Sequence, residues 1–384
     1  MSTYYIQTDI TLEEKAIFSK NLSPGNIYYS FDYIPGSVLW GMCASLFPKS
    51  NMQKFYETFF QDKVIFTNLY PFIGADIVAL PLPLSTFGCK HRPGWTERSV
   101  ISEKHKFYDY LLGISKIDGK CQKCSSEKKS FTNGFYYKKG NTYYSYNTEK
   151  TIDMHNHIDD ELQTTKTIDG LYSYEVLTKG QKFIGYILLH GEWDEFKEIN
   201  GLIDSINGRR ISIGKGRNNG YGLSTINFLV GKNYKLNNEV RLYLSDGLNL
   251  SKDDHKFTLT FLSDSFLLDK YGNYFTYVDE VVLCDILNPN YDINSIFHPE
   301  DFKLIRSFCR KKEIDGFNIK HNLPKNKMIG LQKGSAFYFD YIGSEYIKLN
   351  ERLLEIERNG VGIRKSEGYG IVAINLPYHK ENIE

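Results

Sequence analysis

The sequence lacks two features that would assign it to a broad class at once. No apolar run approaches the roughly 20 residues that a membrane-spanning helix needs, and the opening segment, MSTYYIQTDITLEEKAIF, has no signal peptide. Net charge is also nearly absent, because 47 Lys and Arg residues are balanced by 46 Asp and Glu residues. These absences predict a soluble cytoplasmic protein with no membrane partner. They also mean that a polyanionic partner would have to be recognised by a local cluster of charge.

Cysteine is scarce, and a disulfide framework is therefore not expected. Six cysteines in a chain of 384 residues are more consistent with a reducing compartment and with metal binding. The cysteines stand at positions 43, 89, 121, 124, 284 and 309.

A metal site is predicted around Cys121 and Cys124, because two thiolates at this spacing can occupy one edge of a tetrahedral zinc site. Cys89 lies upstream, and either His105 or His91 would complete a set of three cysteines and one histidine. A structural zinc ion would stabilise a polar segment that has little core of its own. Catalytic zinc is disfavoured, since no H-E-x-x-H pattern is present. The alternative to zinc is a pair of free thiols.

Aromatic residues are abundant, and the 29 Tyr and 25 Phe suit both strands and stacking surfaces. Apolar periodicity predicts an α+β protein, with helices over 38–47, 192–206 and 349–360. Ser37 is the expected N-cap of the first helix, and the polar segment 151–170 is expected to be a loop. Strands are predicted within 3–18, 63–72, 171–191, 223–230, 239–245, 256–263, 281–287 and 327–342.

A glycine-rich segment occurs twice. IGKGRNNGYGLSTI (213–226) aligns without a gap with VGIRKSEGYGIVAI (361–374), and an L-x-K-G-x-x-F pattern precedes each of them, at 177–183 and 331–337. Two landmarks in the same order indicate a duplicated domain, with one copy in 1–230 and the other in 231–384. The alternative is a coincidence of two unrelated turns. Residues from about 87 to 150 change in composition toward Cys, Lys, Gly, Ser and Tyr, which indicates a small insertion in the first domain.

Each glycine-rich loop follows a helix, precedes a strand and carries cationic side chains. Free backbone N–H groups in such a loop can bind an anion, and adjacent Arg or Lys residues supply charge, so a phosphate backbone would fit. A nucleotide-binding P-loop is excluded, because it lies between a strand and a helix and ends in G-K-[ST]. The structural alternative is that the glycines only allow a tight crossover between helix and strand.

Three other polar residues were weighed as catalytic groups. His155 and His157 lie in the polar segment 151–170 and alternate, so both would face one way on an extended backbone. Asp32 is a lone carboxylate beside the turn at 34–37. No further partner is identifiable in the sequence, and no catalytic residue is predicted.

Together, the stretches IPGSVLWGMCASLF, IGKGRNNGYGLSTI, LPKNKMIGLQKGSAFYF and GVGIRKSEGYGIVAINLP resemble the CRISPR-associated RAMP superfamily. The tandem loops and the cysteine-bearing insertion are most similar to the Csx-ten family of type III-D effector complexes. The resemblance implies two tandem ferredoxin-like (RRM-like) domains. It also implies a non-enzymatic subunit in antiviral defence that binds the crRNA 5′ handle, contacts other Cas subunits and meets target RNA indirectly. The alternative within the superfamily is an endoribonuclease.

Position by position, the resemblance carries the glycine-rich loops and the first turn and helix onto this chain, and the neighbouring cations are the expected phosphate contacts. The residues expected to bind RNA are Arg209, Arg210, Gly214, Lys215, Gly216, Arg217, Gly220, Tyr221, Gly222, Lys333, Arg364, Lys365, Gly368, Gly370 and Ser37.

Overall fold

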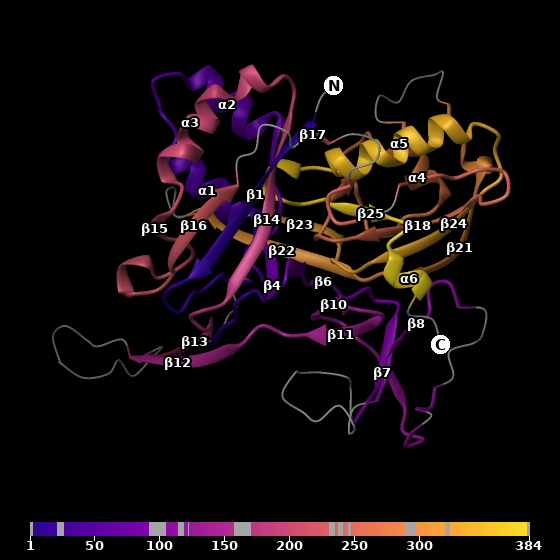
Figure 1. Ribbon diagram of the computed structural model, residues 1–384, viewed down its shortest axis with the longest axis horizontal. Helices are drawn as coiled ribbons and strands as arrows, with labels where there is room; N and C mark the ends of the chain where they lie inside the picture. The colour runs from indigo at the N-terminus through magenta and orange to yellow at the C-terminus, as the bar shows by residue number, and fades with distance from the viewer. Residues whose placement is uncertain are drawn as a thin grey trace.

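The computed structural model describes residues 3–20, 27–91, 105–113, 119–121, 123–156, 170–229, 235–236, 241–244, 247–288, 296–318 and 323–381. Within these ranges the chain is an α+β protein, as predicted, with two main sheets that each carry helices (Figure 1). No helix in these ranges is long and apolar enough to cross a membrane.

The first main sheet is built around β1 (Thr3–Leu12), which pairs antiparallel with β14 (Lys182–His190) and with β16 (Leu223–Leu229). Ile6 and Ile10 of β1 are 1% exposed and belong to a core that the helices close. The remaining strands of this sheet are β3 (Val64–Phe66), β4 (Tyr70–Gly74), β5 (Ile77–Val78), β15 (Arg209–Ser212) and β17 (Lys235–Leu236).

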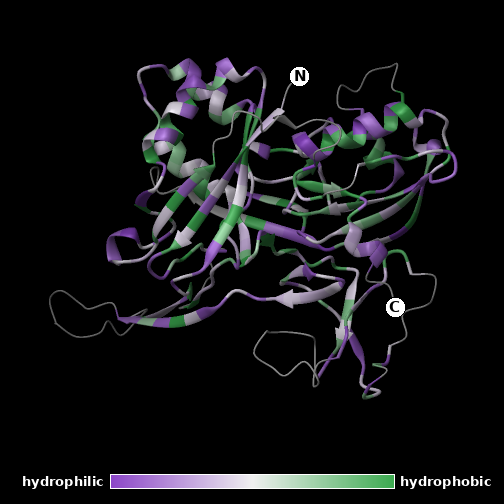
Figure 2. Ribbon diagram, viewed as in Figure 1, coloured by the Kyte–Doolittle hydropathy of each residue, from purple (hydrophilic) through white to green (hydrophobic). Residues whose placement is uncertain are grey.

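Three helices lie together beside the first sheet (Figure 1). They are α1 (Gly36–Leu46), α2 (Met52–Phe60) and α3 (Lys197–Ile206), and a short 3-10 turn, η2 (Trp193–Phe196), leads into α3. The predicted spacing of apolar residues in 192–206 is confirmed, because Ile199, Ile203 and Ile206 are buried on one face of α3. Figure 2 shows hydrophobic and hydrophilic residues alternating along these helices, as expected for helices with one buried face.

The second main sheet has the strand order β21-β24-β18-β25. Its core holds apolar residues of two helices that run over it, α4 (Glu280–Leu287) and α5 (Tyr346–Asn359). The strands are β18 (Lys256–Phe261), β21 (Phe302–Phe308), β24 (Ala336–Tyr341) and β25 (Val372–Ile374), with a 3-10 turn, η4 (Pro299–Asp301), before β21 and a small ribbon of β19 (Leu267–Leu268) and β20 (Tyr274–Phe275) beside them.

The two halves share an order of elements. In each, the first strand (β1 or β18) lies between the last strand (β16 or β25) and the strand that follows the L-x-K-G-x-x-F turn (β14 or β24). The turns match in detail. Gly180 N–H donates to Leu12 O at 2.7 Å, and Gly334 N–H donates to Phe261 O at 2.7 Å. Both glycines have φ 87°.

A hairpin precedes each of these turns. The first is β12 (Lys150–Asn156) with β13 (Leu171–Leu177), and β2 (Ile27–Tyr28) adds a parallel strand to β13. The second is β22 (Lys311–Asn318) with β23 (Leu323–Leu331). In Figure 1, β12 runs along the lower edge of the molecule, away from the helices.

The segment between these parts forms two small sheets against the C-terminus. One joins β6 (Leu80–Pro81), β10 (Phe135–Lys139) and β11 (Thr142–Tyr146), and the other joins β7 (Thr86–Cys89), β8 (Tyr108–Asp109) and β9 (Lys128–Ser130). Tyr136 packs on Tyr378 of the last helix, α6 (Pro377–Glu381), with a ring-centroid distance of 4.2 Å. The cysteine-bearing segment therefore docks on the second half.

Two predicted elements are wrong in type. Residues 281–287 form α4 rather than a strand, because a short apolar run fits either period and the Asp279 carboxylate caps the helix by accepting from Val282 N–H at 2.9 Å. Residues 151–156 form β12 rather than a loop. This strand is polar, so its sequence lacks the apolar alternation that identifies a strand, and the rest of the predicted loop, 157–169, lies outside the described residues.

The other element predictions differ less. The first helix begins at Gly36, so Ser37 lies in its first turn and Pro35 is the N-cap, with no side-chain cap. Of the strand predicted at 239–245, only 241–244 are described, and they form no strand. There the Arg241 guanidinium pairs with the Glu357 carboxylate at 2.6 Å. The sequence gave no sign of α2 as a separate helix.

Candidate nucleic-acid interface and metal centre

The two glycine-rich loops have the same backbone. Gly214, Gly220 and Gly222 of the first loop have φ of 84°, 82° and 81°, and the aligned Gly362, Gly368 and Gly370 have 79°, 89° and 77°. Each loop contains one turn of 3-10 helix, η3 (Arg217–Asn219) or η5 (Lys365–Glu367). The fold thus requires these glycines in both copies, since left-handed φ values disfavour residues with a Cβ.

Close approach of the backbone adds to this requirement. A Cβ on Gly222 would lie 1.9 Å from Ile213 O, and one on Gly370 would lie 1.9 Å from Val361 O. At the fourth left-handed position the copies differ, because Gly216 in the first loop aligns with Arg364, which adopts φ 58°. Geometry alone therefore accounts for most of the glycines, and any difference in function must come from side chains.

In the first loop the cationic side chains are exposed. Lys215 Nζ lies 3.7 Å from the centroid of the Tyr28 ring and 5.1 Å from that of Tyr174. Arg209, Arg210 and Arg217 are exposed, and among the described residues none of the three forms an ion pair. The loop therefore presents four cations beside two aromatic rings.

The hairpin β12–β13 supplies the aromatic side of this surface. Tyr172 and Tyr174 project from β13 toward the first loop, and the His155 ring of β12 stacks on Tyr172 at 5.2 Å with an interplanar angle of 14°. Tyr221 of the loop completes the group, edge-on to Tyr174. We call Tyr28, Tyr172, Tyr174, His155 and Tyr221 the aromatic cluster.

A chain of hydrogen bonds fixes Tyr221 within the aromatic cluster. Its hydroxyl donates to Asp153 Oδ2 at 2.9 Å, Lys15 Nζ donates to Asp153 Oδ1 at 2.7 Å, and His155 Nε2 lies 2.9 Å from the same hydroxyl. Burial raises the pKa of Tyr221 to about 12, and the hydrogen bond to Asp153 adds to the effect. Burial alone would raise the pKa of Asp153, but the bonds from Lys15 and Tyr221 outweigh it and lower the pKa.

In the second loop the cations are already paired. Arg364 Nε donates to Glu367 Oε1 at 2.7 Å, and Lys365 Nζ lies 3.7 Å from Asp62 Oδ2 of the first half. A Cβ on Gly368 would lie 2.6 Å from Phe66 O and 3.2 Å from the Cα of Gly36. The second loop is therefore a contact between the two halves.

The remaining predicted RNA contacts lie near this contact. Lys333 is 9% exposed, and its ammonium lies 3.4 Å from Asp32 Oδ1 and 4.3 Å from the centroid of the Tyr33 ring. Ser37 is half-buried in the first turn of α1, next to Gly36, whose N–H donates to Asn68 Oδ1. Asp32 is thus held in an ion pair, and His157 lies outside the described residues.

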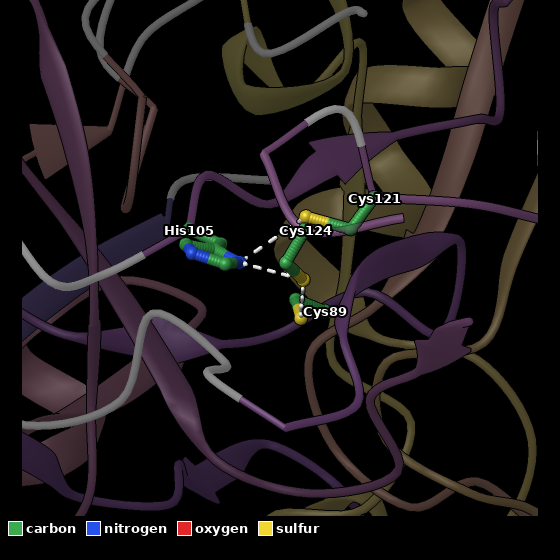
Figure 3. A group of neighbouring side chains, drawn as sticks. All are labelled: Cys89, His105, Cys121 and Cys124. Carbon is green, nitrogen blue, oxygen red and sulfur yellow. Dashed lines mark hydrogen bonds between the residues drawn. The ribbon is translucent and has the colours of Figure 1, made fainter. Parts of the chain in front are cut away.

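The structure brings four predicted metal ligands together (Figure 3). The donor atoms of Cys89, His105, Cys121 and Cys124 all lie within 4.8 Å of one another. Cys89 Sγ is 3.5 Å from Cys124 Sγ, and His105 Nδ1 is 3.2 Å from Cys121 Sγ and 3.4 Å from Cys124 Sγ. His105 therefore completes the group, and His91 is exposed and outside it.

This donor set fits a tetrahedral metal ion. Zinc–sulfur bonds of about 2.3 Å imply sulfur–sulfur edges of roughly 3.8 Å in a tetrahedron, close to the observed separation. Hydrogen bonds from Ser126 lower the pKa of Cys124 to about 7, with smaller contributions from Cys89 and Cys121. A lower pKa favours the thiolate, which is the form that binds metals. The four residues can hold one metal ion.

Comparisons with known proteins add no family. No family model matches the chain, and no curated protein matches it. Among solved structures, it is similar to a chain of type III-B Cmr-beta bound to cognate target RNA, with 13% identity, 86% of each chain covered and a TM-score of 0.43. It is also similar to a Cas6 of Thermus thermophilus, with 9% identity, 97% of this chain and 99% of that chain covered and a TM-score of 0.41. Both TM-scores are below 0.5, so the proposals for this chain rest on its own residues.

Proposed function

We propose that this protein is an RNA-binding structural subunit of a type III CRISPR effector complex, in which it holds the 5′ handle of the crRNA and contacts neighbouring subunits. In this proposal each half is a ferredoxin-like unit, and the resemblance to the Csx-ten family supplies the assembly. The observation that carries RNA binding is the exposed first loop, where Lys215 lies over Tyr28 and Tyr174.

The chemistry of this surface suits single-stranded RNA. Unpaired Arg209, Arg210 and Arg217 would bind phosphates, while flat rings would stack on bases, each stacked base contributing about 1 to 3 kcal/mol. A ring that already carries a cation on one face favours this arrangement, because backbone and bases are then met side by side. A surface for a protein partner alone would not need three unpaired arginines.

The proposal assigns different tasks to the two loops. RNA binding is assigned to the first loop, because its cations are free to meet phosphate. The second loop, with Arg364 and Lys365 in ion pairs and Gly368 packed on the first half, is assigned to joining the halves. Phosphate contacts by Arg364, Lys365 or Lys333 would require breaking those pairs, which makes them weaker candidates than the sequence alone suggests.

Binding to repeat-derived RNA tests the proposal. Each phosphate contact that is lost lowers the slope of log affinity against log salt by about 0.7 for a single strand. We expect Arg210→Ala and Arg217→Ala each to reduce both the affinity and this slope. Lys252→Ala, an exposed cation of the second half, is the control and should change neither. Unchanged slopes in both arginine variants would remove the first loop from the interface.

We further propose that the metal at Cys89, His105, Cys121 and Cys124 is zinc and that it is structural. Three of the four ligands are buried, at 2% for Cys89, 6% for His105 and 7% for Cys121, so little of the coordination sphere faces solvent. A closed set of four protein ligands is typical of structural zinc. Zinc bound there would hold β7 and the segments around β8 and β9 together.

RNA cleavage is a second candidate function, favoured by the hydrogen bonds of His155. Because the Tyr221 proton goes to Asp153, His155 Nε2 must donate to the Tyr221 oxygen, which leaves His155 Nδ1 as an acceptor. In such a reaction Nδ1 would take the proton of a ribose 2′-hydroxyl, the 2′-oxygen would attack phosphorus, and the departing 5′-oxygen would be protonated by solvent. Incubation of the protein with repeat RNA and with target RNA separates this candidate from a purely structural subunit.

A further inference from the structure

Five charged side chains meet where the first half, its hairpin β12–β13 and the second half come together. Asp32 pairs with Lys333 at 3.4 Å, and Glu175 pairs with Lys150 at 2.8 Å. The fifth is Lys20, whose charge acts on Asp32, Lys150, Glu175 and Lys333. All five are partly or largely shielded from solvent, so they line a recess of low solvation rather than an open surface.

Lys20 is the surplus cation of this group. Each carboxylate already has its own lysine, and among the described residues the Lys20 ammonium has no hydrogen-bond or ion-pair partner. Burial lowers the pKa of Lys20, attraction to Asp32 opposes this, and repulsion from Lys150 and Lys333 adds to it. The free protein therefore holds an ammonium that lacks a counter-charge in a partly desolvated place, where an added anion would interact strongly.

The recess continues the surface of the first loop. Lys20 N–H donates to Tyr29 O at 2.9 Å, next in sequence to Tyr28, whose ring carries Lys215. Lys150 Nζ donates to Ser30 O at 3.0 Å, which ties the same strand to the hairpin. A strand of RNA leaving Lys215 thus has a cationic site one or two residues along the protein backbone.

We propose that Lys20, supported by Lys150 and Lys333, binds a second phosphate of the same RNA strand at the junction of the two halves. This inference rests on the proposed RNA-binding function. A phosphodiester oxygen would supply the missing negative charge, and Lys20 would be its direct contact. Asp32 and Glu175 hold the other two lysines in place beside it.

Two measurements on the full-length protein test the site. In salt titrations with repeat-derived RNA, Lys20→Gln should lower the slope by about 0.7 and weaken binding several-fold, whereas Lys20→Arg and the control Lys252→Gln should not. In the second, lysines are acetylated under limiting reagent and quantified by mass spectrometry. Bound RNA should protect Lys20 at least five-fold and leave exposed Lys252 unchanged. Circular dichroism and melting of each variant establish that it is folded.

The outcomes separate this inference from the proposed function. If Arg217→Ala lowers the slope while Lys20→Gln does not and Lys20 stays reactive, the second site is wrong and RNA binding by the loop stands. If neither variant changes the slope, both are wrong. Inorganic phosphate is the further arm, because equal protection of Lys20 by phosphate and RNA at the same concentration would assign the site to a small anion and overturn the proposal.

Discussion

The Nδ1 atom of His379 lies 3.1 Å from Oδ1 of Asp109, and both side chains are fully buried. Asp109 also accepts from Ser85 Oγ at 2.6 Å, and His379 Nε2 lies 2.8 Å from Thr260 Oγ1. This chain of contacts joins the metal-bearing segment, the C-terminal helix α6 and the central strand β18 of the second sheet. It explains why the segment docks on the second half although it interrupts the first.

We predict that His379→Ala destabilises the protein by about 2 to 4 kcal/mol, because it leaves the Asp109 carboxylate buried with one partner fewer. Denaturant unfolding measures the change. His255→Ala is the matched control, since its pair with Asp340 is partly exposed and should contribute below about 1 kcal/mol. Equal losses in the two variants would contradict the role of the buried pair.

Loss of the metal should loosen the segment that carries it. We expect protein purified without chelator to contain about one zinc ion per chain, and Cys121→Ser to contain close to none, with a lower melting temperature. Cys309→Ser, which changes a cysteine outside the cluster, should keep both metal and stability. Elemental analysis and calorimetry check this, and a metal-free wild-type protein of full stability would rule out structural zinc.

Two glycines of the first loop form a matched pair for testing close approach. Gly220 and Gly222 have φ of 82° and 81°, but a Cβ on Gly220 would meet nothing within 4 Å, whereas one on Gly222 would lie 1.9 Å from Ile213 O. Gly220→Ala should therefore cost about 1 kcal/mol of backbone strain, and Gly222→Ala clearly more. The free energy of unfolding of the two variants decides, and an equal cost would mean that strain alone governs the loop.

The aromatic cluster and the cations should affect RNA binding differently. Tyr174→Ala is expected to weaken binding by about 1 to 3 kcal/mol without changing the salt slope, because stacking releases no counterions. Lys215→Ala should lower the slope. Tyr271→Ala, which removes a ring that is 78% exposed in the second half, controls for loss of a surface aromatic residue. A changed slope in Tyr174→Ala would show that the ring acts through its neighbouring cation.

The cleavage candidate predicts products that end in 2′,3′-cyclic phosphate, formed without added metal and lost in His155→Ala. His298→Ala, outside the aromatic cluster, is the control and should cleave as wild type does. Gel analysis of end-labelled RNA measures both. Intact RNA after long incubation with the wild-type protein would leave the structural subunit as the function.

Local and repetitive features were predictable from the sequence. The repeated loop carries its own signal, because the left-handed backbone at Gly222 and Gly370 demands glycine, and the Cys121–Cys124 spacing carries the metal centre. The polar strand β12 was not predictable, since its pairing depends on Tyr172 and Tyr221 rather than on apolar alternation. Contacts across great sequence separation, such as Lys365 with Asp62 or His379 with Asp109, leave no local pattern either.

The pairing of Arg364 with Glu367 also limits how many strands the chain can hold. Two loops of one backbone shape would suggest two equivalent grips per molecule, related by the internal repeat. With the second loop's cations neutralised and turned to the first half, one grip remains, and the repeat loses its symmetry toward ligand. A single strand would then be bound per chain, in one register and one polarity, which is what a subunit positioned at one end of a guide RNA needs.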